Sequence, residues 1–223
     1  MKIGNIDIET TKIICVGENY LDHIEEVKKD IPKEPILFPK TLNVLIGHEQ
    51  PIVYPKYLFN NRRYKRVDYE AELAFFIKKK CKNVQKSEAY DYIMGYTAFN
   101  DVTARKMQVK DMLSQKPWYR SKSFDTFGPI GPRIALSSEI EDPHNLDIKL
   151  YLNGELKQSS NTKHLLFKIP ELVDFISKFF TLEAGDIIAT GTPGGIGPVK
   201  PNDEIKITIN KIGTLFNKVV LEE

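Results

Sequence analysis

Three acidic residues have the spacing of a metal site. Glu70 and Glu72 stand two positions apart in the alternating segment from Val67 to Lys78, so on a strand both side chains point to the same face. Two carboxylates this close disfavour each other unless a cation or a shared proton compensates, and a divalent cation is the simplest solution. Asp101 follows the apolar segment from Gly95 to Phe99 and could bring a third carboxylate to the same place.

The chemistry of these side chains narrows the choice of metal. Carboxylate oxygens without a neighbouring Cys or His cluster favour Mg²⁺ or Mn²⁺ over Zn²⁺. The spacing also fits a second interpretation, in which Glu70 and Glu72 face water on an amphipathic strand and Asp101 only caps a helix that begins near Val102. Both interpretations stay open here, because a Glu-x-Glu pair is a weak signal by itself.

His23 and Glu26 form a second candidate group. They stand at i and i+3 on a predicted helix from about Asn19 to Lys29, with Asn19 as its N-cap, so their side chains are neighbours on one helix face. A hydrogen-bonded His and Glu can position and deprotonate a water molecule. The alternative is an ordinary surface pair beside other acidic residues, which is the more common case for this spacing alone.

A glycine-rich segment from Gly191 to Gly197 follows the apolar stretch from Asp186 to Ala189. Its backbone amides and the hydroxyl of Thr192 could bind an anion. It lacks the Gly-Lys-Ser/Thr ending of a P-loop, which argues against nucleotide binding, and an ordinary tight turn explains it equally well. Three other histidines are interpreted as loop or structural residues: His48, His144 and His164.

The segments around these residues predict an α+β fold, dominated by a mixed β-sheet with few helices. Strands are predicted at Lys12 to Val16 and at Val67 to Lys78, and two more flank Lys211-Ile212-Gly213. The pair Asn153-Gly154 between two alternating segments indicates a two-residue hairpin. Apolar periodicity predicts helices at three further places: Ser87 to Met94, Val102 to Leu113 and Pro170 to Phe180.

Length and turn residues suggest how the chain is divided. A chain of 223 residues fits one large domain with a short N-terminal lobe. Proline, asparagine and arginine accumulate from Pro51 to Arg66. We therefore predict a lobe over residues 1–60, which carries the pair His23 and Glu26, and a catalytic body over residues 61–223.

Charge and composition exclude several classes of partner. Thirty-two basic against 30 acidic residues give a net charge of +2, which offers no overall attraction for nucleic acid or an anionic membrane. No apolar stretch is long enough for a membrane span or a secretory signal. Cys15 and Cys81 lack the spacing of a zinc site or a disulfide framework, which suits a reducing compartment. We expect a cytoplasmic protein that binds neither nucleic acid nor membrane.

Five ordered motifs resemble those of the fumarylacetoacetate hydrolase family, over about residues 13 to 220. The motifs are Cys15-Val-Gly-Glu-Asn-Tyr-Leu-Asp-His-Ile-Glu-Glu26, Asp68-Tyr-Glu-Ala-Glu-Leu-Ala74, Gly95-Tyr-Thr-Ala-Phe-Asn-Asp-Val-Thr-Ala-Arg105, Ser121-Lys-Ser-Phe-Asp125 and Thr190-Gly-Thr-Pro-Gly-Gly-Ile-Gly197. Five motifs in the same order are far more specific than any one of them. The resemblance therefore favours the metal site and the catalytic pair over the alternatives above.

The resemblance implies a mixed β-roll of the type found in the family's C-terminal domain, and a homodimer as the active unit. It implies that Glu70, Glu72 and Asp101 bind Mg²⁺ or Mn²⁺, and that His23 and Glu26 form a lid pair that activates water. It also implies roles for four more residues: catalytic for Lys122, and substrate-binding for Arg105, Gln108 and Thr192.

The chain is most similar to short members of the family, of the acylpyruvase and oxaloacetate decarboxylase type. Our main hypothesis is a Mg²⁺-dependent hydrolase that cleaves a C–C bond in acylpyruvate-type 2,4-dioxo acids, with the metal bound to the carboxylate and 2-oxo oxygens of this small 2-oxo acid substrate. The alternative uses no water: decarboxylation or tautomerisation of oxaloacetate, or a reaction like that of 2-hydroxyhepta-2,4-diene-1,7-dioate isomerase. A third hypothesis is a binding protein without turnover.

Two positions depart from the family pattern. Glu18 occupies a place in the Gly-x-Asn-Tyr turn where the family often has Arg, and Thr41 follows Lys40 where a proline is common. Both lie in or near the lobe that is expected to meet the variable end of the substrate. They therefore bear on the identity of the substrate, and Glu18 is the only motivation for the third hypothesis.

Overall fold

The structure, a computed structural model, describes residues 1–21 and 31–223. The seven-stranded sheet has the order β4 (Ile36–Lys40), β3 (Ile13–Gly17), β13 (Ile187–Ala189), β8 (Ala71–Ile77), β9 (Ile93–Asn100), β10 (Gly128–Leu136) and β5 (Leu45–Ile46). The five-stranded sheet has the order β12 (Glu155–Asn161), β11 (Asp147–Leu152), β15 (Glu204–Ile209), β16 (Gly213–Leu221) and β6 (Ile52–Tyr54). Two-stranded sheets pair β1 (Lys2–Ile3) with β2 (Ile6–Asp7), and β14 (Gly197–Val199) with β7 (Val67–Tyr69).

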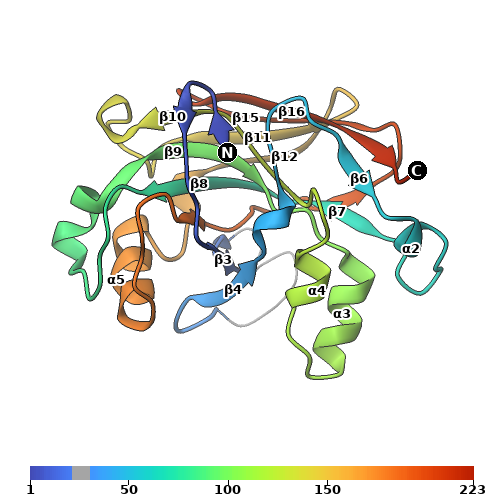
Figure 1. The fold of residues 1–223 in the computed structure, drawn as a ribbon, viewed down its shortest axis with the longest axis horizontal. Coiled ribbons are helices and arrows are strands. Elements are labelled where there is room, and N and C mark those ends of the chain that lie inside the picture. The colour runs from blue at the N-terminus through green and yellow to red at the C-terminus, as the bar shows by residue number, and fades with distance from the viewer. Residues whose placement is uncertain (22–30) are drawn as a thin grey trace.

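Short helices complete the described part of the chain. The α-helices are α2 (Lys56–Phe59), α3 (Arg105–Leu113), α4 (Tyr119–Lys122) and α5 (Ile169–Phe179). The 3₁₀-helices are η1 (Leu42–Val44), η2 (Lys86–Tyr92), η3 (Ser137–Glu139) and η4 (Thr162–His164). Figure 1 shows the five-stranded sheet above β8 and β9, with α3, α4 and α5 below them. Parallel and antiparallel pairs occur together in both large sheets, so the predicted α+β fold with a mixed sheet is confirmed.

Strand β8 is buried along its whole length, which explains its sequence. The single strand predicted from Val67 to Lys78 is two strands in the structure, β7 and β8, with Glu70 between them. β7 pairs with β14, whereas β8 lies between β9 and β13. The face that carries Glu72 continues with Ala74 and Phe76, which are also buried. The interpretation of an amphipathic strand with its glutamates in water is therefore wrong.

The helix predicted from Val102 to Leu113 is α3, which begins three residues later. Thr103 pairs with Asp68 in an isolated bridge, in which each donates its backbone N–H to the other's carbonyl oxygen at 3.0 and 2.8 Å. This pairing keeps the chain extended after Asp101. The N-cap position of α3 is Ala104, so the interpretation of Asp101 as a helix cap is also wrong.

The remaining predicted elements differ in outcome. The helix from Pro170 to Phe180 is confirmed as α5, and the strand from Lys12 to Val16 as β3. The Asn153-Gly154 turn joins β11 to β12, and both residues have the positive φ angles, 52° and 83°, that such a turn requires. The helix predicted from Ser87 to Met94 is confirmed over most of its length as the 3₁₀-helix η2, but it ends at Tyr92, because the chain joins the central sheet as β9 from Ile93.

Strands from residues 1–60 belong to the same sheets as the rest of the chain. β3 pairs in parallel with β13, β5 with β10, and β6 with β16. Backbone hydrogen bonds therefore cross the predicted boundary, and the division into residues 1–60 and 61–223 stays a prediction. The helix predicted from about Asn19 to Lys29 falls mainly on residues 22–30, which lie outside the described part of the chain.

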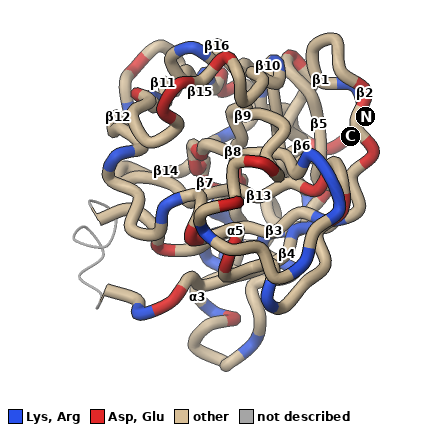
Figure 2. The backbone as a smooth tube through the Cα atoms, turned by 90° about the vertical axis from the view of Figure 1, so that its left-hand side faces the viewer, with Lys and Arg blue, Asp and Glu red and all other residues tan. Residues whose placement is uncertain are grey.

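Charged residues of both signs are distributed over the molecule. Segments of lysine and arginine and segments of aspartate and glutamate are both scattered over the described backbone (Figure 2). Over residues 1–21 and 31–223, none of the helices has both the length and the apolar character needed to cross a membrane.

His144 makes a pH-dependent contact at the start of α5. Its Nε2 accepts a hydrogen bond from the backbone N–H of Ile169 at 3.0 Å. Burial, together with the nearby charge of Lys168, lowers the pKa of His144 below its ordinary value. The unfolded chain then binds a proton more readily than the folded chain, so this contribution to stability is present above about pH 6.5 and is lost as the pH falls through the folded pKa.

We therefore expect the free energy of unfolding to fall between about pH 7 and pH 5, partly because of His144. Chemical denaturation across this range measures the fall. His144→Gln should make it smaller, whereas His164→Gln, at an exposed position on η4, should leave it unchanged. The same pH dependence in wild type and His144→Gln would contradict this role of His144.

Candidate metal and substrate site

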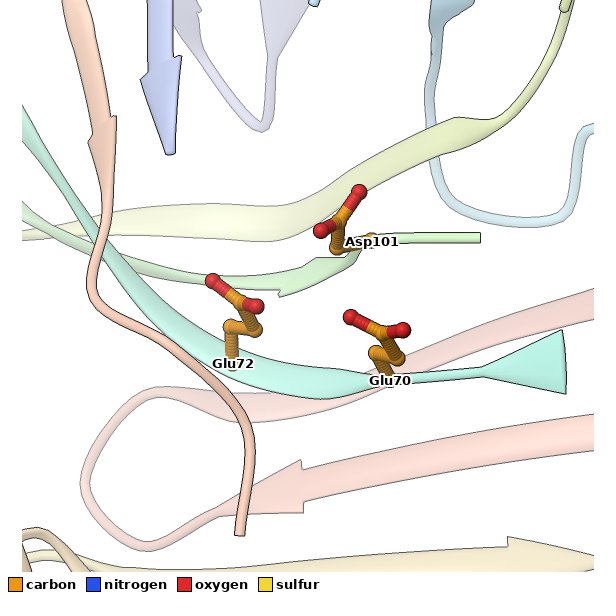
Figure 3. Close-up of side chains that lie close together, drawn as sticks. All are labelled: Glu70, Glu72 and Asp101. Atoms are coloured by element: carbon orange, nitrogen blue, oxygen red, sulfur yellow. The ribbon is translucent and has the colours of Figure 1, made fainter. Parts of the chain in front are cut away.

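Strands β8 and β9 bring three carboxylates together. Glu72 lies within β8, Glu70 immediately before it, and Asp101 immediately after β9. The antiparallel register places Ala71 opposite Asn100, and the N–H of Asp101 donates to the carbonyl oxygen of Glu70 at 2.9 Å. The three side chains point toward one another (Figure 3), and one oxygen of each lies within 4.8 Å of the others.

Two lysine side chains balance part of this buried charge. The exposed fraction is 6% for Glu70, 1% for Glu72 and 0% for Asp101. The Nζ of Lys122 lies 2.9 Å from Oε2 of Glu70 and 2.5 Å from Oδ2 of Asp101. The Nζ of Lys40 lies 2.6 Å from the other oxygen of Asp101. Each of these buried carboxylate contacts lowers the electrostatic cost of burying the group of like charges.

The two glutamates differ in their electrostatic surroundings. Burial alone would raise the pKa of Glu70, but the charges of Lys122 and Arg105 hold that pKa below its ordinary value. Burial raises the pKa of Glu72 well above its ordinary value, and the negative charges of Asp101 and Glu70 raise it further. Glu72 is therefore the carboxylate whose ionised form gains most from added positive charge.

Arg105, the first residue of α3, connects the carboxylates to β7. Its Nε donates to Oδ2 of Asp68 at 2.9 Å, and its other nitrogens donate to Glu70 and, at 2.5 Å, to Oε1 of Gln108. Asp68 is fully buried and also accepts hydrogen bonds from Arg66. These charge-assisted bonds fix the orientation of the Arg105 guanidinium.

The segment from Gly191 to Gly197 meets the carboxylates through its first residues. Gly191 has a φ of +100°, and its N–H donates to Oε2 of Glu72 at 2.9 Å. The hydroxyl of Thr192 accepts a hydrogen bond from the amide of Gln158 at 2.9 Å. The Gly191 amide thus binds a carboxylate of the protein itself, and the use of this segment to bind a ligand anion stays a prediction.

A cavity of about 260 Å³ lies beside the carboxylates. It is lined by every predicted site residue in the described part of the chain: Glu70, Glu72, Asp101, Arg105, Gln108, Lys122 and Thr192. The other lining residues are mostly apolar: Val16, Gly17, Glu18, Phe38, Val109, Met112, Trp118 and Ile196. Residues from distant parts of the sequence therefore line one cavity, whose wall has both charged and apolar parts.

The predicted pair His23 and Glu26 lies outside the described residues. The described chain reaches the cavity just before this segment, since Val16, Gly17 and Glu18 line it. The relation of the pair to the carboxylates stays a prediction.

Two neighbours of the site, Lys40 and Asp68, are not among the residues predicted from the sequence. A lysine at the end of an apolar strand gives no sign of burial until the pairing of β4 with β3 is known. Asp68 could have been found, because the alternation that places Glu70 and Glu72 on one face also includes Asp68.

Comparison with known proteins identifies the family. Residues 12–220 match the family described as fumarylacetoacetate (FAA) hydrolase C-terminal. The chain belongs to the fumarylacetoacetate hydrolase family. The family predicted from five motifs is confirmed, and the mixed, curled sheet with few helices is the fold of fumarylacetoacetate hydrolases.

Three relatives show the range of reactions in the fumarylacetoacetate hydrolase family. A mitochondrial oxaloacetate tautomerase from Xenopus laevis is 44% identical over 94% of this chain and 65% of its own length. The crystal structure of 5-carboxymethyl-2-hydroxymuconate delta-isomerase from Mycobacterium smegmatis is 40% identical with a TM-score of 0.85, over 97% of this chain and 81% of the isomerase. Fumarylpyruvate hydrolase from Pseudomonas aeruginosa, solved with Mn²⁺ and pyruvate, is 29% identical with a TM-score of 0.89, over 99% of this chain and 95% of the hydrolase.

The donor set fits a hard divalent cation. Mg²⁺ and Mn²⁺ prefer oxygen ligands, and the oxygens of Glu70, Glu72 and Asp101 already lie within 4.8 Å of one another. Burial raises the pKa of Glu72 and the charges of Asp101 and Glu70 raise it further, and a cation at this place would oppose both effects. The three carboxylates can therefore hold a metal ion.

We expect Mn²⁺ to bind more tightly as the pH rises and to release protons, because the raised pKa of Glu72 means that a proton competes with the cation. Titration calorimetry in two buffers of different ionisation enthalpy counts the protons released. Glu72→Gln should remove this release and weaken binding at least about tenfold. Glu88→Gln, at an exposed position on η2, is the matched control; proton release that persists in Glu72→Gln would assign it to another group.

Removing the ammonium of Lys122 should destabilise the metal-free protein, because Glu70 and Asp101 lose a buried partner. For Lys122→Met we expect the free energy of unfolding to fall by about 3–5 kcal/mol. Mn²⁺ should then raise the Tm of the variant by more than it raises that of the wild type, since the cation replaces the missing charge. Lys116→Met, at an exposed position, should behave as wild type; equal gains in all three proteins would contradict the argument.

Proposed function

We propose that this chain is a Mg²⁺-dependent hydrolase that cleaves a C–C bond in acylpyruvate-type 2,4-dioxo acids. The main support is the buried group of three carboxylates that shares a small cavity with two cations, Arg105 and Lys122. A small acid with neighbouring carboxylate and carbonyl oxygens is complementary to such a mixture of charges. Fumarylpyruvate hydrolase, which this chain matches over 95% of its length, holds Mn²⁺ and pyruvate.

The site residues have distinct roles in this proposal. A divalent cation held by Glu70, Glu72 and Asp101 supplies Lewis-acid chemistry toward the carboxylate and 2-oxo oxygens of the substrate. Lys122 keeps its ammonium buried beside these carboxylates, where it can donate a hydrogen bond to a substrate oxygen that gains negative charge. Gln108 lines the same cavity and offers an amide donor to the same charge.

Two further groups bind the substrate and supply water. Arg105 and Thr192 line the cavity and would bind the substrate carboxylate. His23 and Glu26 would deprotonate a water molecule, whose oxygen adds to the carbonyl carbon at position 4. The bond between carbons 3 and 4 then breaks and carbon 3 takes up a proton, which gives pyruvate and a second carboxylic acid.

A second candidate function is tautomerisation or decarboxylation of oxaloacetate. The identity of 44% with an oxaloacetate tautomerase supports it, and the identity of 40% with a delta-isomerase supports the related isomerisation of an unsaturated diacid. These reactions need the same cation and cationic side chains but no attacking water. Dependence on His23 and the mass of the products therefore distinguish them from hydrolysis.

The cellular setting is also part of the proposal. We propose Mg²⁺ as the metal in the cell, a homodimer as the active unit and the cytoplasm as the location. The two buried free cysteines suit a reducing compartment.

The test is mass-resolved product analysis with Mg²⁺ and acetylpyruvate, fumarylpyruvate or oxaloacetate. We expect an acylpyruvate to give pyruvate and a second acid, and EDTA to abolish this reaction. His23→Ala should lower its rate by about 10² to 10⁴, because a general base contributes a factor of this size. His164→Ala is the control. Release of CO₂ or a product of unchanged mass, insensitive to His23→Ala, would assign the second candidate, and no turnover of any of the three would contradict both.

A further inference from the structure

We propose that the cavity selects 2-oxo acids whose distal end is apolar, and discriminates against those that carry a second carboxylate about six carbons along the chain. This inference rests on the proposed function, because it concerns the far end of the same substrate. Three features of the cavity wall carry it: the order of residues along α3, the aromatic pair next to Lys122, and the distribution of charge.

One face of α3 changes from charged to apolar along the cavity. Arg105, Gln108, Val109 and Met112 all line it, and their spacing of i, i+3, i+4 and i+7 places them on one side of the helix. A rise of 1.5 Å per residue puts Met112 about 10 Å along the axis from Arg105. Arg105 contacts Glu70, so the carboxylate group lies at the charged end of this face and Val109 and Met112 lie away from it.

An aromatic wall begins next to Lys122. The Nζ of Lys122 lies 4.8 Å from the ring centroid of Phe38, and Phe38 meets Trp118 edge to face at 5.2 Å. Trp118 in turn packs against the backbone of Gly17, where an added Cβ would lie 3.0 Å from its ring. α3 and α4, which flank Trp118, lie side by side in Figure 1. The cavity is therefore apolar on two sides beyond its charged end.

Charge in the described wall opposes a distal carboxylate. The cations that line the cavity are Arg105 and Lys122, and both lie at its charged end, beside Glu70. Apart from these two cations and the three carboxylates, the charged residue that lines the cavity within residues 1–21 and 31–223 is Glu18, whose charge is negative. A second carboxylate would lose its water against apolar side chains without gaining a cation from this wall, whereas a methyl group would gain from burial.

The test compares two ligands of equal length, 2-oxohexanoate and 2-oxoadipate, with pyruvate as the head group alone. Binding to the chain of 223 residues with Mg²⁺ is measured by calorimetry and by the fluorescence of Trp118, its single tryptophan. Lengthening the tail from pyruvate to 2-oxohexanoate should tighten binding by about three- to fourfold per buried methylene. 2-Oxohexanoate should bind at least about tenfold more tightly than 2-oxoadipate.

A matched pair of variants locates the effect. Met112→Arg should weaken binding of 2-oxohexanoate and strengthen that of 2-oxoadipate, because it places a cation on the apolar wall. Leu113→Arg adds the same charge one residue on, at a side chain that is 84% exposed and does not line the cavity, and should leave the ratio of the two affinities unchanged.

The outcomes separate this inference from the proposed function. If pyruvate binds but 2-oxoadipate binds as tightly as 2-oxohexanoate, or if both variants change the ratio equally, the inference is overturned and the 2-oxo acid site remains. If none of the three ligands binds in the presence of Mg²⁺, the proposed function is overturned together with the inference.

Discussion

Burial of three carboxyl groups, with one oxygen of each within 4.8 Å of the others, is the constraint on which the site depends. Carboxylates in a low-dielectric interior repel strongly, so each needs a positive or hydrogen-bonding neighbour. Those neighbours come from separate parts of the sequence: Lys40 ends β4, Lys122 ends α4, and Gly191 follows β13. Elements that are far apart in the sequence thus meet at this site, where each supplies a partner to one of the carboxylates.

The interruption between β7 and β8 shows how the backbone is adapted to this constraint. At the break, the N–H of Glu70 donates to the side-chain oxygen of Asn100 at 3.0 Å, and that of Ala71 donates to the side-chain oxygen of Gln158 at 3.0 Å. Side-chain amides therefore replace the partners that a regular ladder would supply. Gln158 also donates to Thr192, so one residue of β12 ties the carboxylate strand to the glycine-rich segment.

The sequence carried much of this arrangement in advance, and the differences have physical causes. Strand alternation placed Glu70 and Glu72 on one face, and the five motifs supplied the family and the charged residues that line the cavity. The apolar wall formed by Phe38, Val109, Met112 and Trp118 lies outside those motifs. Local patterns could not show that the other face of β8 would also be covered, because that depends on how two sheets pack. Nor could local patterns show why α3 begins later than predicted. The delay follows from the bridge between Thr103 and Asp68, which are 35 positions apart in the sequence.

The order of strands in the sheets also determines when the site can form during synthesis. β8 lies between β9, which follows it closely, and β13, which is made about half the chain later. In the same way β6 can pair only after β16 has been made, since Ile52 pairs with Val219. Pairings this distant in sequence form late, after the costly closure of long loops. We therefore expect the carboxylates to stay hydrated and ionised during synthesis until β13 has been made and can cover β8.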